Sequence, residues 1–229
     1  MRARLAVAGT IGGLAAVVVL VVLVLKFGQH HPSPPSLADH PNAAIPGQLL
    51  YADDHDCLVR VAASGAEREQ VYCPGGPVLE VTWVDGHTAA FAGAAKPGQP
   101  TWTQIDLSTK IPTETGRAAT FPPPDEVSVK GERVNIASNG DIYVFANGTR
   151  TKIASFDVPE YGEPMLVTWS PDGGWLLLLY QPRKGNHAEL WIVSRDGSIK
   201  GTVADDVRAW GGPFASWWID GAGFLPKHY

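Results

Sequence analysis

Basic residues are in the minority in this 229-residue chain, which has 18 Lys and Arg against 23 Asp and Glu. Arg2, Arg4 and Lys26 flank an apolar stretch near the N-terminus, and no acidic residue precedes Asp39. The remainder therefore holds 15 basic and 23 acidic residues, a formal charge of −8. A domain without a Lys/Arg face has no surface for phosphate backbones, so we expect no nucleic-acid partner.

Catalytic and nucleotide-binding signatures are also missing. The chain contains no Gly-x-Ser-x-Gly, no His-Glu-x-x-His and no Gly-x-x-x-x-Gly-Lys-Ser/Thr. These motifs form the nucleophile turn of hydrolases, the zinc site of metalloproteases and the phosphate cradle of nucleotide-binding proteins. We therefore expect no enzyme activity and no cofactor.

Cysteine occurs only twice, at Cys57 and Cys73. The segment between them has the pattern of a hairpin centred on Gly65, which places Cys57 opposite Cys73 and Val59 opposite Val71. Directly opposed Cβ atoms lie about 4.5–5.5 Å apart, close to the distance that a disulfide requires. We predict a Cys57–Cys73 disulfide; the alternative is two unpaired small apolar side chains.

Charge is absent from residues 5–25, a run of 21 apolar or small residues. At about 1.5 Å per residue, a helix of this length spans the roughly 30 Å hydrocarbon layer of a bilayer. The alternative is a cleaved signal peptide, whose apolar core has about 7–15 residues and ends at a small-residue cleavage site. Lys26-Phe-Gly-Gln-His-His-Pro follows instead, so we predict an uncleaved transmembrane signal anchor.

The charges beside this run predict its orientation. Arg2 and Arg4 favour a cytoplasmic location for residues 1–4, and a disulfide persists outside the reducing cytosol. Residues 26–46 contain five prolines among Ser, His and Gly, a composition typical of an extended linker. We expect a single-pass cell-membrane protein whose C-terminal domain, residues 47–229, is extracytoplasmic.

Four segments share a strand followed by a turn. Aligned on Trp83, Ser128, Trp169 and Trp217, they recur at steps of 45, 41 and 48 residues. Four-stranded propeller blades repeat at roughly 40–45 residues. The segments are Val81-Thr-Trp-Val-Asp-Gly86, Glu126-Val-Ser-Val-Lys-Gly131, Val167-Thr-Trp-Ser-Pro-Asp-Gly173 and Ser216-Trp-Trp-Ile-Asp-Gly221.

Each of the first three segments is followed by three further expected strands. Their polarity rises from the second strand to the fourth, as in blades stacked around an axis. The second strands are expected at 89–92, 133–137 and 175–180, the third at 102–107, 141–145 and 189–193, and the fourth at 111–115, 151–156 and 199–203.

The repeat is clearest over residues 165–199, which contain Ser170-Pro-Asp-Gly173. This stretch resembles the Ser-Pro-Asp-Gly repeat of the TolB-like, WD40-like β-propellers. The resemblance extends at repeat level from residue 47 to about 225 and implies a non-enzymatic scaffold for protein contacts.

The two ends of the domain predict how it closes. The first unit, with strands expected at 48–53, 57–63 and 68–73, lacks a first strand, whereas residues 215–221 form a spare one. We predict that the C-terminal strand completes the N-terminal blade, which gives a small, closed, all-β propeller of four blades preceded by one transmembrane helix. The alternatives are a fifth, irregular blade and an open stack of blades that a partner closes.

The densest polar cluster is Asp53-Asp54-His55-Asp56, in a turn of the first unit. Asp53, Asp54 and Asp56 could ligate a divalent ion, but they lack the Asp-x-Asp-x-Asp-Gly spacing, and acidic turns are commonly just solvated. We therefore predict no metal site.

Aromatic residues suggest two roles. Trp83, Trp169, Trp191 and Trp217 occupy equivalent or inward-facing positions and are expected in the core between blades. We assign Trp210, Phe214, Trp218 and Trp102 as candidate partner-contact residues; the alternative is that they cover the ring closure.

These expectations favour a membrane-anchored module, tethered through residues 5–25, that binds an extracytoplasmic protein or an envelope polymer. The alternatives are a tunnel-site enzyme of the lactonase-like or carbohydrate-active kind, and a signal-transducing accessory of a neighbouring membrane protein.

Overall fold

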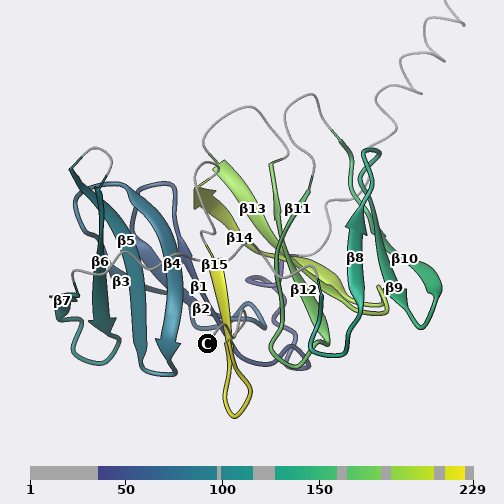
Figure 1. Cartoon of the computed structure of the whole chain (residues 1–229), viewed down its shortest axis with the longest axis horizontal. Helices are drawn as coiled ribbons and strands as arrows, with labels where there is room; N and C mark the ends of the chain where they lie inside the picture. The colour runs from purple at the N-terminus through teal and green to yellow at the C-terminus, as the bar shows by residue number, and fades with distance from the viewer. Residues whose placement is uncertain are drawn as a thin grey trace, which may run out of the picture. The chain divides into compact units, whose positions relative to one another are not determined.

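The structure, a computed structural model, describes residues 36–96, 99–115, 127–158, 164–181, 187–208 and 215–224. Within these ranges the regular elements are all β-strands (Figure 1). In chain order they are β1 Gln48–Ala52, β2 Leu58–Ala62, β3 Glu69–Tyr72, β4 Val78–Asp85, β5 Thr88–Lys96, β6 Gln99–Asp106, β7 Pro112–Glu114, β8 Arg133–Ile136, β9 Asp141–Ala146, β10 Thr149–Ser155, β11 Met165–Trp169, β12 Trp175–Tyr180, β13 His187–Ser194, β14 Lys200–Arg208, β15 Ala215–Ile219 and β16 Gly223–Phe224.

The expected transmembrane segment, residues 5–25, lies outside the described ranges. In the part that the structure describes, no helix is long and apolar enough to cross a membrane. The C-terminal half of the expected linker packs on the domain, because Leu37 and Ile45 are buried and the Leu37 amide donates to the Thr202 carbonyl at 2.8 Å. The compact unit therefore begins before residue 47.

The strands form four antiparallel sheets, as the repeat predicts. Sheet 1 has the order β16-β15-β1-β2-β3, sheet 2 contains β4–β7, sheet 3 contains β8–β10 and sheet 4 contains β11–β14. Of the expected first strand of sheet 3, the described part forms an isolated bridge between Val127 and Arg133. The second, third and fourth strands match the predicted segments to within a few residues, except that β5 and β14 continue four and five residues further.

Sheet 1 joins the two ends of the domain. β15 pairs antiparallel with β1, and Leu49 faces Trp217 while Leu50 faces Ser216. The prediction that the C-terminal strand completes the N-terminal sheet is confirmed. The sequence did not predict β16, which covers the other edge of β15 and pairs Trp218 with Phe224.

Hydrophobic clusters fill the spaces between neighbouring sheets. Trp217 and Leu49 pack between sheets 1 and 4, Trp83 between sheets 1 and 2, and Trp169 between sheets 3 and 4. These three tryptophans are at most 1% exposed, and Trp191 is 5% exposed. The expectation that the four tryptophans belong to the core is confirmed.

Contacts between strands place sheet 2 beside sheet 1, sheet 1 beside sheet 4, and sheet 4 beside sheet 3. No comparable contact joins the described strands of sheets 2 and 3 (Figure 1). The described residues thus show a propeller-like stack of four sheets, and closure into a ring stays a prediction.

The Ser-Pro-Asp-Gly turn shows why strand and turn recur together. The Ser170 hydroxyl oxygen accepts the amides of Gly174 and Trp175, at 3.1 and 2.9 Å, and Asp172 Oδ1 accepts the Gly174 amide at 2.9 Å. Gly173 has φ +66°, a left-handed conformation that glycine adopts without strain. Ser170, Asp172 and Gly173 of the motif therefore each stabilise the turn.

The two ends of the sheets differ. We call "Gly-turn end" the end with the marker turns at Asp85-Gly86, Lys130-Gly131, Asp172-Gly173 and Asp220-Gly221. We call "loop end" the opposite one, where β1, β12 and β14 finish and β2, β13 and β15 begin. The loop end is at the top of Figure 1.

Candidate functional site

The candidate site is built on the turn between β1 and β2, at the loop end. Asp53 is 5% exposed, and its Oδ1 accepts the amides of His55 at 3.0 Å and Cys57 at 2.7 Å. The Asp53 amide donates to the Cys57 carbonyl at 2.9 Å, and Asp56 has φ +62°. An aspartate that bonds amides further along the chain holds a tight turn in one conformation, so this turn is ordered by its own residues.

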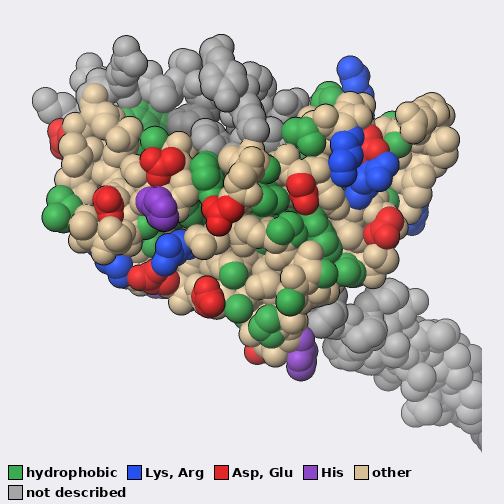
Figure 2. Space-filling view, turned by 90° about the horizontal axis from the view of Figure 1, so that it is seen from below, with side chains coloured by type: hydrophobic (Ala, Val, Ile, Leu, Met, Phe, Trp, Pro, Cys, Tyr) green, Lys and Arg blue, Asp and Glu red, His purple; other side chains and the backbone are tan. Residues whose placement is uncertain are grey.

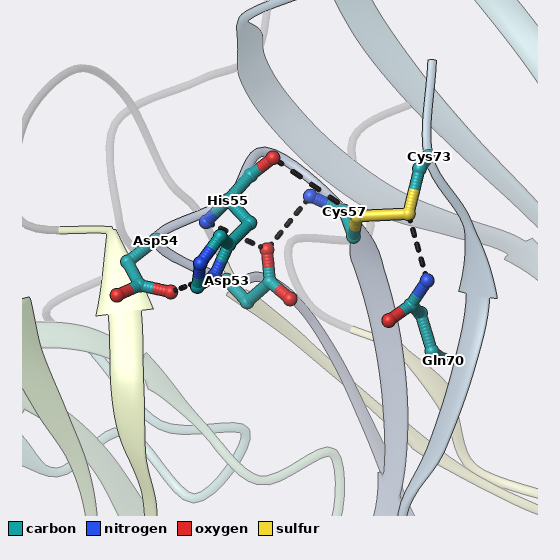
Figure 3. The surroundings of a disulfide bond; sticks show 6 residues. All are labelled: Asp53, Asp54, His55, Cys57, Gln70 and Cys73. Carbon is teal, nitrogen blue, oxygen red and sulfur yellow. Dashed lines mark hydrogen bonds and ion pairs between the residues drawn. A yellow bond between two sulfur atoms is a disulfide. The ribbon is translucent and has the colours of Figure 1, made fainter. Parts of the chain in front are cut away.

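A disulfide fixes the end of this turn. Cys57 and Cys73 are bonded, with Cα atoms 4.2 Å apart, and Figure 3 shows the bond beside the turn. The predicted pairing of the cysteines is confirmed. The predicted pairing of Val59 with Val71 is wrong, because the register shifts after Leu58 and Val59 faces Gln70. A bulge of this kind leaves one residue of the longer arm unpaired.

Asp54 lies between two histidines. Its Oδ1 is 2.6 Å from Nδ1 of His55, and its Oδ2 is 2.7 Å from Nδ1 of His187, the first residue of β13. The Asp54 side chain is 9% exposed, whereas His55 and His187 are 82% and 68% exposed. The fold thus brings the solvent-facing imidazole of His187, distant in the sequence, to a largely buried carboxylate whose other oxygen faces the neighbouring His55.

The backbone holds Asp54 against sheet 4. Its amide donates to the Asp206 carbonyl at 2.7 Å, and Asp53 forms a bridge with Val207, both in β14. These two contacts fix the backbone at Asp54 beside β14.

Asp56 points to a different partner. Its Oδ1 pairs with the Arg208 guanidinium and accepts the Val78 amide at 3.1 Å, while Arg208 also donates to the Val78 carbonyl at 2.9 Å. Of the three candidate carboxylates, Asp53 and Asp54 therefore lie together with His55, and Asp56 links the turn to β4 and β14.

A second polar network lies below the turn. The buried Tyr51 hydroxyl donates to Asp206 Oδ1 at 3.0 Å and accepts from Arg68 Nε at 2.9 Å, and Arg68 pairs with Asp206. Burial raises the pKa of Tyr51 well above its ordinary value of 10.0, so its hydroxyl stays protonated. This network joins β1 to β14.

The predicted aromatic contact residues do not form one cluster among the described residues. Trp102, on β6, is 4% exposed and packs with Ala90 and Ala92. Trp218, on β15, is half-buried; its Nε1 donates to Asp220 at 2.8 Å, and its ring centroid is 6.2 Å from that of Trp83. Trp210 and Phe214 lie outside the described residues.

The opposite, Gly-turn end carries dispersed charge. Figure 2 shows it from below, with acidic side chains scattered over the face and most of the visible Lys and Arg gathered on one side. One pair there joins Arg195 to Glu132, whose side chain is 8% exposed. This pair connects sheets 4 and 3 at the Gly-turn end.

The sequence did not predict that His187, Asp206 and Arg208 belong to the site. His187 lies two residues before the third strand expected at 189–193, and Asp206 and Arg208 lie three and five residues beyond the fourth strand expected at 199–203. Strand directions were the available signal, since antiparallel pairing brings the start of β13 and the end of β14 to the same end of the sheets as the β1–β2 turn.

Comparisons with known proteins identify no family. No protein-family model and no curated protein matches the chain. Among solved structures, TolB from Acinetobacter baumannii is 15% identical with a TM-score of 0.27, and covers 78% of this chain and 68% of its own length. A putative TolB from Agrobacterium tumefaciens is 19% identical with a TM-score of 0.29, and covers 81% and 68%. A prolyl endopeptidase is 16% identical with a TM-score of 0.28, and covers 74% of this chain and 30% of its own. TM-scores this low assign neither a family nor a function.

Proposed function

We propose that the chain is a membrane-tethered, extracytoplasmic binding module that holds another protein or an envelope polymer at its loop end and catalyses no reaction. The observation that carries the proposal is the β1–β2 turn, which a disulfide and pairing with β14 hold at the loop end of the sheets. A surface that is already ordered loses less conformational entropy on binding than a loop that must fold on its partner.

Two features support the tether and the location. Residues 5–25 are long and apolar enough to span a bilayer as a helix. The Cys57–Cys73 disulfide is of the kind that persists outside the reducing cytosol. In this arrangement the anchor keeps the domain next to the membrane, so the diffusional search between the domain and its partner is confined to two dimensions.

The net charge of the domain indicates the kind of contact. Asp54 and Asp56 of the loop end are paired with His187 and Arg208, but the chain beyond Lys26 carries a formal charge of −8. Complementary charges at the rim of an interface mainly raise the association rate and are screened by salt. The partner should therefore present basic groups and associate more slowly as ionic strength rises.

Site-specific photo-crosslinking in intact membranes tests which end binds. Gly76, in the exposed connection between β3 and β4, is a suitable loop-end position because an added Cβ would meet no atom within 4 Å. The matched control is exposed His87, at the Gly-turn end. We expect a partner adduct from position 76 and none from position 87. Adducts only from position 87 would contradict the proposal.

Alkaline carbonate extraction of membranes tests the tether. The full chain should remain in the membrane pellet, and a variant without residues 5–25 should be released. Release of the full chain into the supernatant would overturn the proposed anchor.

A further inference from the structure

The outer face of sheet 3 combines arginine and aromatic side chains. Sheet 3 stands at one end of the stack, on the right of Figure 1. Val134 and Val144 point from it into the core that sheets 3 and 4 share. Phe145 lies on the other face, directly opposite Arg133 on β8 and Arg150 on β10. Because opposed residues of neighbouring strands share a face, these three side chains form one row that points away from sheet 4.

The positive charge of this row is not neutralised by any carboxylate of the described residues. The described ranges contain six arginines, of which four form ion pairs with Asp or Glu: Arg60, Arg68, Arg195 and Arg208. The other two are Arg133 and Arg150, both exposed, beside a Phe145 side chain that is 38% exposed. In a domain whose excess charge is acidic, this row is therefore a local basic surface.

The neighbouring row adds no free positive charge. Tyr143 faces Asn135 on β8 and Lys152 on β10. The Lys152 ammonium lies 2.5 Å from Oδ1 of Asp141, and the Tyr143 hydroxyl donates to the other oxygen of Asp141 at 3.1 Å. The two arginines are therefore the groups of this face that remain to bind an anion.

Aromatic rings already orient one of these arginines. The guanidinium carbon of Arg150 lies 3.6 Å from the centre of the Tyr143 ring and 5.7 Å from that of the Phe145 ring. Both distances are within the roughly 6 Å of a cation–π contact. A guanidinium stacked in this way can still bind a carboxylate through two parallel hydrogen bonds. Because its side chain is already ordered, it loses less conformational entropy on binding.

We propose that this arginine–aromatic face, made of Arg133, Tyr143, Phe145 and Arg150, binds an extended acidic segment of another protein. Arginine and aromatic residues are enriched at protein interfaces, and a few such residues supply most of the binding energy. Three strands about 4.8 Å apart span only about 10 Å, which suits a segment better than the broad surface of a folded domain. The ring face of Tyr143 that Arg150 covers is not available to a sugar, which favours a peptide over a polysaccharide.

The row sets the sequence pattern that the segment should have. An extended chain advances about 3.3 Å per residue and alternates its side chains, so residues i, i+2 and i+4 share one side over about 13 Å. Acidic residues at i and i+4 can then meet Arg133 and Arg150, while an apolar residue at i+2 contacts Phe145 between them. This contact is independent of the proposed loop-end function, which calls for a partner with basic groups.

The proposal applies to the open stack that the described strands form. Closure of the ring would pack this face of sheet 3 against sheet 2 and would bury the row. A partner segment bound here would instead cover the exposed end of the stack.

Fluorescence anisotropy with a labelled peptide of repeated Glu-Ser-Leu-Ser, which follows this pattern, tests the face on the full chain in neutral detergent. We expect binding that weakens as salt rises, and none of the matched peptide with Gln in place of Glu. Arg133→Gln/Arg150→Gln should bind the peptide about threefold to tenfold more weakly, the loss expected for two exposed ion pairs. The matched control, Lys130→Gln/Lys200→Gln, removes two exposed charges of the Gly-turn end and should change the affinity by less than about twofold.

Phe145→Ala separates a shaped contact from general charge attraction. This variant keeps the net charge and should still bind the peptide at least about threefold more weakly, while circular dichroism shows each variant folded. No peptide binding by the parent, or equal affinity of the parent and either the double arginine variant or Phe145→Ala, would overturn the proposal. Binding of polygalacturonate without binding of the peptide would also overturn it, because the face would then recognise an acidic polysaccharide.

Discussion

Removal of the disulfide should destabilise the domain by an amount that follows from the length of the loop it closes. Cys57 and Cys73 are 16 residues apart. In the chain-entropy model a loop of this length contributes about 3 kcal/mol, because the crosslink restricts the unfolded chain. The double variant Cys57→Ala/Cys73→Ala keeps both positions apolar and isolates this effect from the loss of packing.

Urea unfolding followed by tryptophan fluorescence measures the change, since the chain has eight tryptophans. With a urea dependence of about 2 kcal/mol per molar, the unfolding midpoint should fall by about 1.5 M. Treatment of the oxidised parent protein with a reductant should lower the unfolding midpoint as well. A loss below about 1 kcal/mol would refute the reasoning, because it would mean that the unfolded chain is already restricted without the crosslink.

Other changes should act through core packing, charge and backbone conformation. Trp217→Ala should lower the free energy of unfolding by about 3–5 kcal/mol, whereas Ile111→Ala, at a position 64% exposed, should change it by about 0.5 kcal/mol or less in the same urea assay. Hydrogen bonds, first from a nearby serine hydroxyl, lower the pKa of Asp196 from 3.8 to about 2. The Asp196 carboxylate therefore contributes fully to the free energy of unfolding above its unfolded pKa, and this contribution is lost as the pH falls from about 4 to about 2. Acid titration should therefore show a smaller stability loss over this window for Asp196→Asn; an identical loss would contradict the assignment. Gly197→Ala should destabilise more than Gly148→Ala: both glycines have positive φ, but only at Gly197 would the new Cβ meet a backbone carbonyl oxygen, at 2.3 Å. Equal thermal unfolding midpoints for these two variants would show that the contact costs nothing.

Local signals were sufficient for most strands and turns. Segments such as Trp175–Tyr180 are apolar and bounded by turn residues, so their extent follows from composition and from the Ser-Pro-Asp-Gly chemistry before them. The disulfide and the pairing of β15 with β1 were also predictable, because spacing and an unfilled first strand allow few other arrangements.

Features that depend on distant contacts were not predictable from local patterns. The register shift that places Val59 opposite Gln70 is a one-residue bulge between the strands, which the composition of the hairpin does not indicate. Contact of His187 with Asp54 depends on how sheet 4 packs on sheet 1. A histidine at the start of a strand has no local signature, so this half of the candidate site could only emerge from the assembled sheets.

Cysteine crosslinking between β1 and β15 tests most directly whether the two ends of the domain form one sheet. Gln48 faces Trp218, so Gln48→Cys/Trp218→Cys should form a second disulfide under mild oxidation, detected by loss of thiol labelling. The matched control, Gln48→Cys/Ile219→Cys, moves one thiol by one residue to the other face of the strand and should stay reduced. Selective oxidation of the first pair is the predicted result. Equal oxidation of the two pairs, or none in either, would contradict the split sheet on which the loop end is built.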